Sequence, residues 1–356
     1  MNMSKQTSKT PGPPHIDVRP EWLVLEQEAP LEGALSIVDA HHHLYEFQDK
    51  RYLVGDMLAD LQQGHRVLST VFIECGTHYL ADGPEELRSV GEVRFVNAQR
   101  EHARDLGAEA EICAAVIGRV DLRLGDRAAP VLDALVRESE GRLRGIRNIS
   151  VWHPDPTVQA SAAKPPPGLL ADPAFRAGFA CLAPRGLVFE AWLVHTQLDE
   201  LHALASAFPS TQIVLNHLGG PLALGPYADQ RAAVFATWRD GLRRLARLPN
   251  VVIKLGGFGM PLFGFGFHQR PVPPSSTVIA DAIGPYVDAC LELFGAERCL
   301  FESNFPVDKG SFNYTTFWNA CKRIALQRPA REAELLLAGT AAQLYRMQEV
   351  PGRPQE

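Results

Sequence analysis

Short apolar runs recur along the chain and alternate with longer segments of helical spacing. The runs are nearly continuous in Val, Ile, Leu and Phe, which is typical of parallel strands that are covered by helices on the outside. Eight of them can be read in order: LSIVDAH, STVFIEC, CAAVIGRVD, LRGIRNISVW, LVFEAWLVH, TQIVLNHLG, NVVIKLGGF and RCLFESNFPV. Eight parallel strands are the number that closes a (β/α)8 barrel.

Several segments between the runs carry apolar residues three and four positions apart, as an amphipathic helix does when it packs on a core. The clearest are residues 91–106, 199–208 and 228–248. Alternation of strands and helices also describes an open doubly wound sheet. The pattern therefore favours an α/β barrel over that sheet without excluding it.

The composition fits one soluble domain with a large core, because 46% of the 356 residues are hydrophobic and 21% are charged. The net charge of −6 argues against a nucleic-acid surface. No apolar run approaches the roughly 20 residues that a membrane span needs. Six scattered cysteines and an N-terminus without an apolar signal segment favour a reduced, cytoplasmic compartment.

The polar, Pro-rich residues 1–18 predict a disordered tail, and residues 19–350 a single barrel domain. Two stretches, 154–168 and 256–276, predict long loops inside that domain. The second is rich in glycine and phenylalanine. We expect it to cover the mouth of the barrel or to contact another copy in a homo-oligomer.

The first apolar run ends in three consecutive histidines. Residues i and i+2 of a strand share a face, so His41 and His43 project together and His42 points the other way. Two imidazoles in these positions can both reach one metal ion about 2.0–2.1 Å from each nitrogen. The alternative is a pair of hydrogen-bonded surface histidines at a strand exit.

Two further histidines follow other strands. His195 ends the fifth apolar run and His217 ends the sixth. Barrel enzymes place their chemistry at the carboxyl ends of the strands. We therefore expect four imidazoles to converge at one mouth.

The motifs DAHHH, LVHTQL, VLNHLGGP, LPNVVIKLGG and FESNFPVD occur in this order. With them the chain resembles the amidohydrolase superfamily, most closely the branch of sugar-acid lactonases and 2-pyrone-4,6-dicarboxylate hydrolase. The resemblance covers roughly residues 36–346 and implies a distorted (β/α)8 TIM barrel that hydrolyses a lactone, ester or related bond.

The resemblance also implies roles for the histidines. His41, His43 and His195 would hold a divalent ion, Zn²⁺ or Mn²⁺, and His217 would orient the substrate or stabilise the oxyanion. Several members of the lactonase branch work without a metal. In that case the same histidines would donate hydrogen bonds to the developing oxyanion.

The chain departs from the family pattern on the eighth strand, where it reads ESNFP. Asn304 stands at the position of the family's aspartate, and an amide cannot act as a general base. Glu302 lies two residues earlier, on the same face. We expect it to supply the missing negative charge as a ligand or as the base, or else to pair with a buried cation such as Lys254 or Arg147.

Four residues are candidates for substrate contacts. Arg147 could clamp a substrate carboxylate through its planar fork, or form a structural ion pair. Lys254 interrupts an apolar strand and should point inward at the mouth. Glu74 could add a second carboxylate, and His153 follows the fourth strand. Asp308 is expected to be an ordinary loop charge.

The sequence thus predicts a hydrolase that opens a small anionic lactone or ester by attack of water at the mouth of a barrel. Two alternatives remain. One is a metal-dependent decarboxylase of an aromatic or unsaturated acid, which would release CO2. The other is a barrel that binds a small molecule without catalysis, although a pure binding pocket has little use for four imidazoles.

Overall fold

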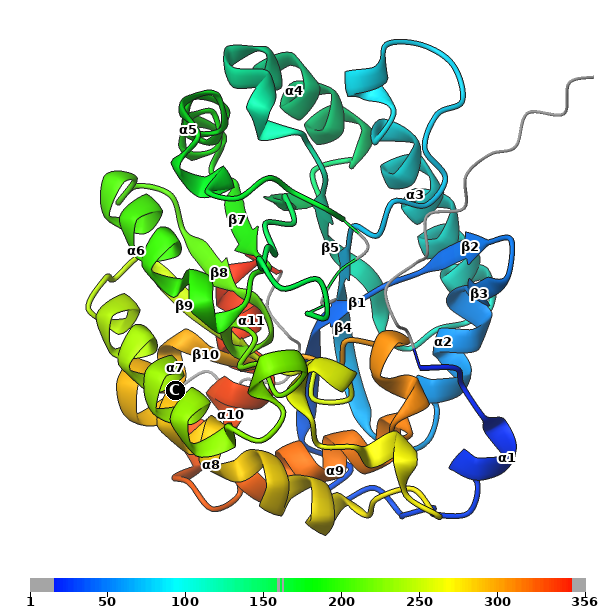
Figure 1. Ribbon diagram of the computed structural model, residues 1–356. Coiled ribbons are helices and arrows are strands. Elements are labelled where there is room, and N and C mark those ends of the chain that lie inside the picture. Colours follow the sequence, from blue (N-terminus) through cyan, green and yellow to red (C-terminus); the bar gives the residue numbers. More distant parts are fainter. Residues whose placement is uncertain (1–15, 159–160, 162, 348–356) are drawn as a thin grey trace, which may run out of the picture.

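The computed structural model describes residues 16–158, 161 and 163–347. Eight parallel strands pair in sequence order and form a nearly closed barrel (Figure 1). The predicted (β/α)8 fold is therefore confirmed. The strands are β1 (Ser36–His42), β4 (Arg66–Ile73), β5 (Glu111–Gly118), β6 (Leu143–Arg147), β7 (Val188–Ala191), β8 (Ile213–Leu215), β9 (Val251–Leu255) and β10 (Cys299–Phe301). Strands β2 (Tyr45–Phe47) and β3 (Lys50–Tyr52) form a separate hairpin.

Helices follow the strands and surround them (Figure 1). The three helices expected from their spacing are α3, α6 and α7, each within three residues of the expected bounds. The helices are α1 (Pro20–Leu23), α2 (Val54–Leu61), α3 (Val90–Asp105), α4 (Ala128–Glu138), α5 (Pro173–Ala180), α6 (Leu198–Ala207), α7 (Arg231–Ala246), α8 (Ser276–Phe294), α9 (Tyr314–Ala325), α10 (Ala330–Glu334) and α11 (Thr340–Leu344).

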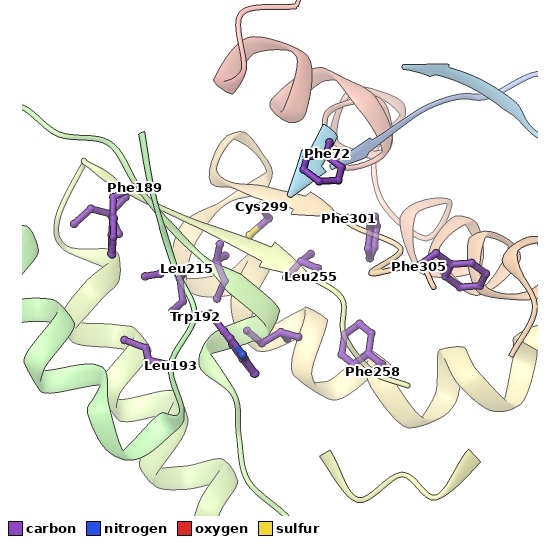
Figure 2. Packing of buried hydrophobic residues seen from close by; sticks show 14 of the residues in the cluster. Phe72, Phe189, Trp192, Leu193, Leu215, Leu255, Phe258, Cys299, Phe301 and Phe305 are labelled. Carbon is purple, nitrogen blue, oxygen red and sulfur yellow. The ribbon is translucent and has the colours of Figure 1, made fainter. Parts of the chain in front are cut away.

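The strands divide the core into two layers, because successive side chains point to opposite faces. The outer layer packs between strands and helices, and Figure 2 shows part of it, with Phe189, Leu255 and Phe301 on β7, β9 and β10. The inner layer fills the barrel with smaller side chains. It consists of Val38, Ala40, Val71, Ile73, Ala115, Ile117, Val188, Val214, Val252 and Leu300, with Ala338, Ala341 and Tyr345 from the C-terminal helices.

An irregularity in β1 decides where its histidines point. Val38 and Ala40 face the interior, so strict alternation would turn His41 outward. The register of β1 against β4 shifts between Asp39 and His42. A bulge of this kind turns the following side chains over. His41 and His43 consequently face inward.

The segment after β10 closes the barrel. The backbone N–H of Asn304 donates to the carbonyl of His41 at 2.9 Å, and that of His43 donates to Phe305 at 2.8 Å. Asn304 and Phe305 therefore lie directly beside the histidine run of β1.

The long loop after β9 packs against the barrel rather than standing away from it. Phe258, Phe263 and Phe267 are at most 3% exposed. A homo-oligomer remains a prediction, as do the domain bounds 19–350, since residues 1–15 and 348–350 lie outside the described part of the chain. Among the described residues, no helix is both long and apolar enough to cross a membrane.

Candidate active site

A layer of polar side chains lies inside the barrel, nearer its mouth than the apolar layer. On each of the last four strands, a polar residue follows an inward-facing apolar residue by two positions. The four are fully buried: Glu190, Asn216, Lys254 and Glu302. Burial of this kind is costly unless the groups satisfy one another, so their contacts define the site.

Glu302 holds two histidines at once. Its Oε1 lies 2.6 Å from His217 Nδ1 and accepts the backbone N–H of His217 at 3.2 Å. Its Oε2 lies 2.7 Å from His41 Nδ1. A carboxylate only accepts, so the Nδ1 atoms carry the protons and the Nε2 atoms keep free lone pairs. Gly256 makes room for this arrangement, because a Cβ there would lie 2.2 Å from Glu302 Cγ.

The backbone at His217 is held in an unusual conformation, with a φ of 49°. The left-handed region costs a non-glycine residue about 1–3 kcal/mol and persists where the surroundings enforce it. The two contacts with Glu302 provide that constraint here. The edge of the Trp192 ring packs on His217 at a centroid distance of 4.8 Å.

The Nε2 atoms of His41 and His43, which carry no proton, face each other. The His43 Nδ1–H donates to the carbonyl of Ile73 at 2.8 Å, which leaves Nε2 bare in the neutral ring. The Nε2 atoms of the two rings are 3.1 Å apart. Burial lowers the pKa of both imidazoles well below 6.5, with Lys254 adding to the effect on His41 and Arg147 to that on His43. Two neutral rings in this arrangement need a proton or a cation between them.

The polar layer below the histidines is organised by Glu190. Lys254 Nζ forms an ion pair with Glu190 Oε2 at 2.9 Å and lies 3.9 Å from Glu302 Oε2. Asn216 Nδ2 and the Tyr345 hydroxyl also donate to Glu190. Lys254 thus points inward as expected, but beneath the histidines and onto carboxylates of the protein.

The guanidinium of Arg147 binds the carboxylate of Glu74. Its Nε donates to Glu74 Oε1 at 2.7 Å and its Nη2 to the carbonyl oxygen of the same residue at 2.5 Å. Its Nη1 lies 3.5 Å from His41 Nε2. Arg119 approaches the other oxygen of Glu74 at 3.7 Å. Of the two interpretations open for Arg147, the described contacts favour the ion pair.

Asn304 turns away from the histidines. Its Nδ2 donates to Asp308 Oδ1 at 2.9 Å, and its backbone φ is 55°. Asp308 is not the expected loop charge, because it is fully buried and accepts the backbone N–H of Gly259 at 2.8 Å. Burial raises the pKa of Asp308 to about 8, and nearby Glu302 adds to the rise.

His195 has its contacts at the rim, away from Glu302. Its Nδ1 accepts the backbone N–H of Leu222 at 3.3 Å, and its ring meets that of Tyr227 edge-on. His153 Nε2 lies 3.0 Å from the Tyr227 hydroxyl. The four expected imidazoles thus divide: His41 and His217 contact Glu302, His43 contacts His41, and His195 pairs with Tyr227. A turn from His195 to Gln197, separated from the end of β7 by three residues, directs this ring.

The central donor set fits a divalent cation. Within the described residues, His41, His217 and Glu302 have potential ligand atoms that all lie within 4.8 Å of one another. Two nitrogens bound to one tetrahedral ion lie roughly 3.3 Å apart, close to the 3.1 Å between His41 and His43. In metal sites the second ring nitrogen usually donates to a carboxylate or a backbone carbonyl. Here His43 Nδ1 donates to Ile73, and His41 Nδ1 lies 2.7 Å from Glu302 Oε2.

The same centre contains unsatisfied polar atoms. Among the described residues, His41 Nδ1, Glu302 Oε2 and Lys254 Nζ lack a hydrogen bond of good geometry. Because buried polar groups are normally satisfied, this concentration indicates a place for a further polar group.

Sequence reasoning missed Glu190, Asn216, Asp308 and Tyr227. The first two carried a signal, since each stands two positions after an inward-facing valine in its strand. Asp308 and Tyr227 gave no such signal in the sequence, because both follow loops whose path the local sequence does not specify.

The family model for amidohydrolases matches residues 38–347. The chain belongs to the amidohydrolase family. It is 30% identical to L-fucono-1,5-lactonase of Burkholderia multivorans over 321 residues, which cover 89% of this chain and 98% of the relative.

Solved structures agree with this assignment. An amidohydrolase from Burkholderia multivorans with bound HEPES superposes with a TM-score of 0.63 and 26% identity, covering 88% of this chain and 99% of the other. A crystal form of a Burkholderia multivorans amidohydrolase with bound zinc has the same TM-score and coverage at 24% identity, which shows the shared fold. Membership confirms the predicted resemblance and makes this chain a hydrolase related to lactonases.

Proposed function

We propose that this chain hydrolyses the ester bond of a small polyhydroxylated sugar-acid lactone. One observation supports this most: a buried carboxylate, Glu302, holds the imidazoles of His41 and His217 at the mouth of a barrel. The chain shares this barrel with an L-fucono-1,5-lactonase over nearly its whole length. A neutral lactone fits better than the expected anionic one, because Arg147 is engaged by Glu74.

The Nε2 atoms of His41 and His43 would hold a divalent ion, Zn²⁺ or Mn²⁺. When bound, the ion polarises the lactone carbonyl and acidifies water. His217, rather than His195, is the third imidazole at the centre, and it serves there as the base and not as a metal ligand. Among the described residues, no contact joins Asn304 to the histidine rings, so we assign Asn304 to closing the barrel beside them.

His217 and Glu302 together replace the missing aspartate as the base. His217 Nε2 takes a proton from the attacking water while Glu302 stabilises the resulting imidazolium through Nδ1–H, the logic of a catalytic dyad. The water oxygen bonds to the carbonyl carbon. The ring C–O bond then breaks, and the proton held at Nε2 passes to the leaving oxygen. The product is the open-chain hydroxy acid.

A lactone panel containing L-fucono-1,5-lactone tests the proposal, with turnover followed by acid release in protein loaded with Zn²⁺ or Mn²⁺. We expect Glu302→Gln to lower kcat about 10–100-fold, because the amide cannot orient both imidazoles. Glu334→Gln, on the exposed face of α10, is the matched control. Absence of turnover on every lactone, or release of CO2 from aromatic acids instead, would overturn the proposal.

A further inference from the structure

The guanidinium of Arg147 has one nitrogen that Glu74 does not hold. Its Nε donates to Glu74 Oε1 at 2.7 Å, and its Nη2 donates to the backbone carbonyl of Glu74 at 2.5 Å. The third nitrogen, Nη1, lies 3.5 Å from His41 Nε2. A contact of this length is longer than a hydrogen bond of normal strength. Among the described residues Nη1 has no closer acceptor, so its protons are available to a ligand.

Glu74 fixes the orientation of this guanidinium. Two contacts with one residue, one to its side chain and one to its main chain, hold the planar group in a single orientation. Glu74 directly follows β4 and Arg147 is the last residue of β6, so both are carried by strands of the barrel and not by a loop. The free nitrogen is therefore positioned before any ligand binds, as a group that stabilises a transition state must be.

Arg147 lies on the accessible side of the reaction centre. His41 and Glu302 have no exposed surface, whereas Arg147 and His43 are each 5% exposed and His217 is 3% exposed. The His41 ring contacts these three residues. Its Nε2 is 3.5 Å from Arg147 Nη1 and 3.1 Å from His43 Nε2, and its centroid is 4.7 Å from that of His217. A carbonyl group beside the His41 ring is thus within reach of both the proposed base and the guanidinium.

Arg147 supplies a positive charge that the neighbouring rings do not. Burial lowers the pKa of His41 and of His43 well below 6.5, so both imidazoles are neutral near pH 7. A guanidinium stays protonated throughout the working pH range. In a buried site a charged donor stabilises a developing anion more than a neutral donor does.

We propose that Arg147 Nη1 donates a hydrogen bond to the carbonyl oxygen of the lactone and stabilises the oxyanion that forms there. The assignment rests on the proposed lactonase function. When the water oxygen bonds to the carbonyl carbon, the π electron pair moves to the carbonyl oxygen, which Arg147 faces. The pair returns as the ring C–O bond breaks. Arg147 is thus a catalytic residue, and Glu74 is a positioning residue that acts through it.

Turnover of L-fucono-1,5-lactone by Arg147→Lys tests the assignment. Lysine keeps a cation for Glu74, but its compact ammonium lacks the fork that contacts Glu74 and the carbonyl oxygen together. We expect kcat to fall on the order of 100-fold with a smaller change in KM, because the donor acts mainly on the transition state. Arg142→Lys is the matched control, because Arg142 is a buried arginine just before the amino end of the same strand and donates to the carbonyl of Cys113.

Product binding gives a readout that does not depend on turnover. In the product the former carbonyl oxygen belongs to a carboxylate, which Arg147 still faces. Calorimetry on chelator-treated protein compares the open-chain acid, L-fuconate, with L-fucitol, in which CH2OH replaces the carboxylate. The wild-type protein should bind the acid on the order of 10-fold more tightly. Glu74→Gln with Arg147→Met, which removes both charges of the buried pair, should lose this preference.

An unchanged kcat in Arg147→Lys would overturn the assignment, and so would a preference for the acid that persists in the double variant. If the wild-type protein turns over no lactone, the proposed function fails, and the ratio of acid to alditol binding then decides on Arg147 alone. If the wild-type protein turns over the lactone and Arg147→Lys does so equally well, only the assignment of Arg147 fails.

Discussion

His42 is fully buried, yet it lies on the opposite face of β1 from His41 and His43. Its Nε2 lies 3.9 Å from Cys113 Sγ and its ring packs edge-on to Phe72, both in the outer layer of the core. Burial lowers the pKa of His42 to about 3. Neighbouring residues of one type thus differ in role because one is surrounded by apolar groups and the others by polar ones.

This pKa makes His42 a source of acid instability. In the unfolded chain the pKa of His42 is about 6.5, so below this pH the unfolded chain binds a proton that the folded chain does not bind. The free energy of unfolding therefore decreases as the pH falls from 6.5 toward 3. His42→Leu should remove a loss of about 2 kcal/mol at pH 5 relative to pH 7.5. Urea unfolding at the two pH values measures it. Equal pH dependence in both proteins would contradict the assignment, and the variant should keep its lactone turnover.

Asn304 offers a second prediction at the same scale. Asn304→Asp introduces the carboxylate expected at this position and places it against Asp308, whose Oδ1 lies 2.9 Å from Asn304 Nδ2. We expect no gain in kcat and, above pH 8 where Asp308 is ionised, a loss of about 1–3 kcal/mol of unfolding free energy, because the donated hydrogen bond becomes a like-charge contact. Adding Asp308→Asn should restore most of the stability. A rise in turnover in the single variant would show that Asn304 can reach the reacting water.

At the scale of elements, β7, β8, β9 and β10 are joined through their inward-facing polar layer. Glu190 is the centre, since it accepts from Asn216 and Tyr345 and forms an ion pair with Lys254. Tyr345 follows α11, so this contact ties the C-terminal helix to the layer directly beneath the histidines. A buried charge pair of this kind specifies one arrangement of the strands more than it adds stability.

A double-mutant cycle measures the interaction energy between Lys254 and Glu190. Lys254→Met alone leaves Glu190 buried without its cation and should cost about 3–5 kcal/mol of unfolding free energy. Lys254→Met with Glu190→Gln removes both charges and should cost clearly less than the sum of the single variants. Simple additivity in denaturant unfolding would mean that the two side chains do not interact in the folded protein.

At the scale of the whole molecule, the proposed reaction centre lies at the junction where the barrel closes. His41 and His43 belong to β1 and Glu302 follows β10, and these strands come together through the backbone of Asn304 and Phe305. The site therefore exists only in the closed fold. A cation that binds there stabilises the folded chain and has no comparable site in the unfolded one.

We therefore expect Zn²⁺ or Mn²⁺ to raise the Tm of chelator-treated protein. At a free concentration of 100 times Kd the gain is about 2.7 kcal/mol, measurable as a thermal shift. His43→Ala should abolish the shift, whereas His42→Leu, which changes the adjacent residue on the other face, should retain it. An equal shift in both variants would place the ion elsewhere.

The sequence by itself determined the barrel, because eight apolar runs and the helical spacing between them are local patterns, and the confirmed fold follows from them. It also determined that polar side chains gather at the carboxyl ends of the strands, since each follows an apolar run, although only the bulge in β1 turns His41 and His43 inward. Only the tertiary structure decided which of them meet. The turn after β7 directs His195 to Tyr227, the path after β8 brings His217 to Glu302, and the fold of distant loops buries Asp308. These contacts join residues far apart in the chain, and no local pattern specifies the distance between them.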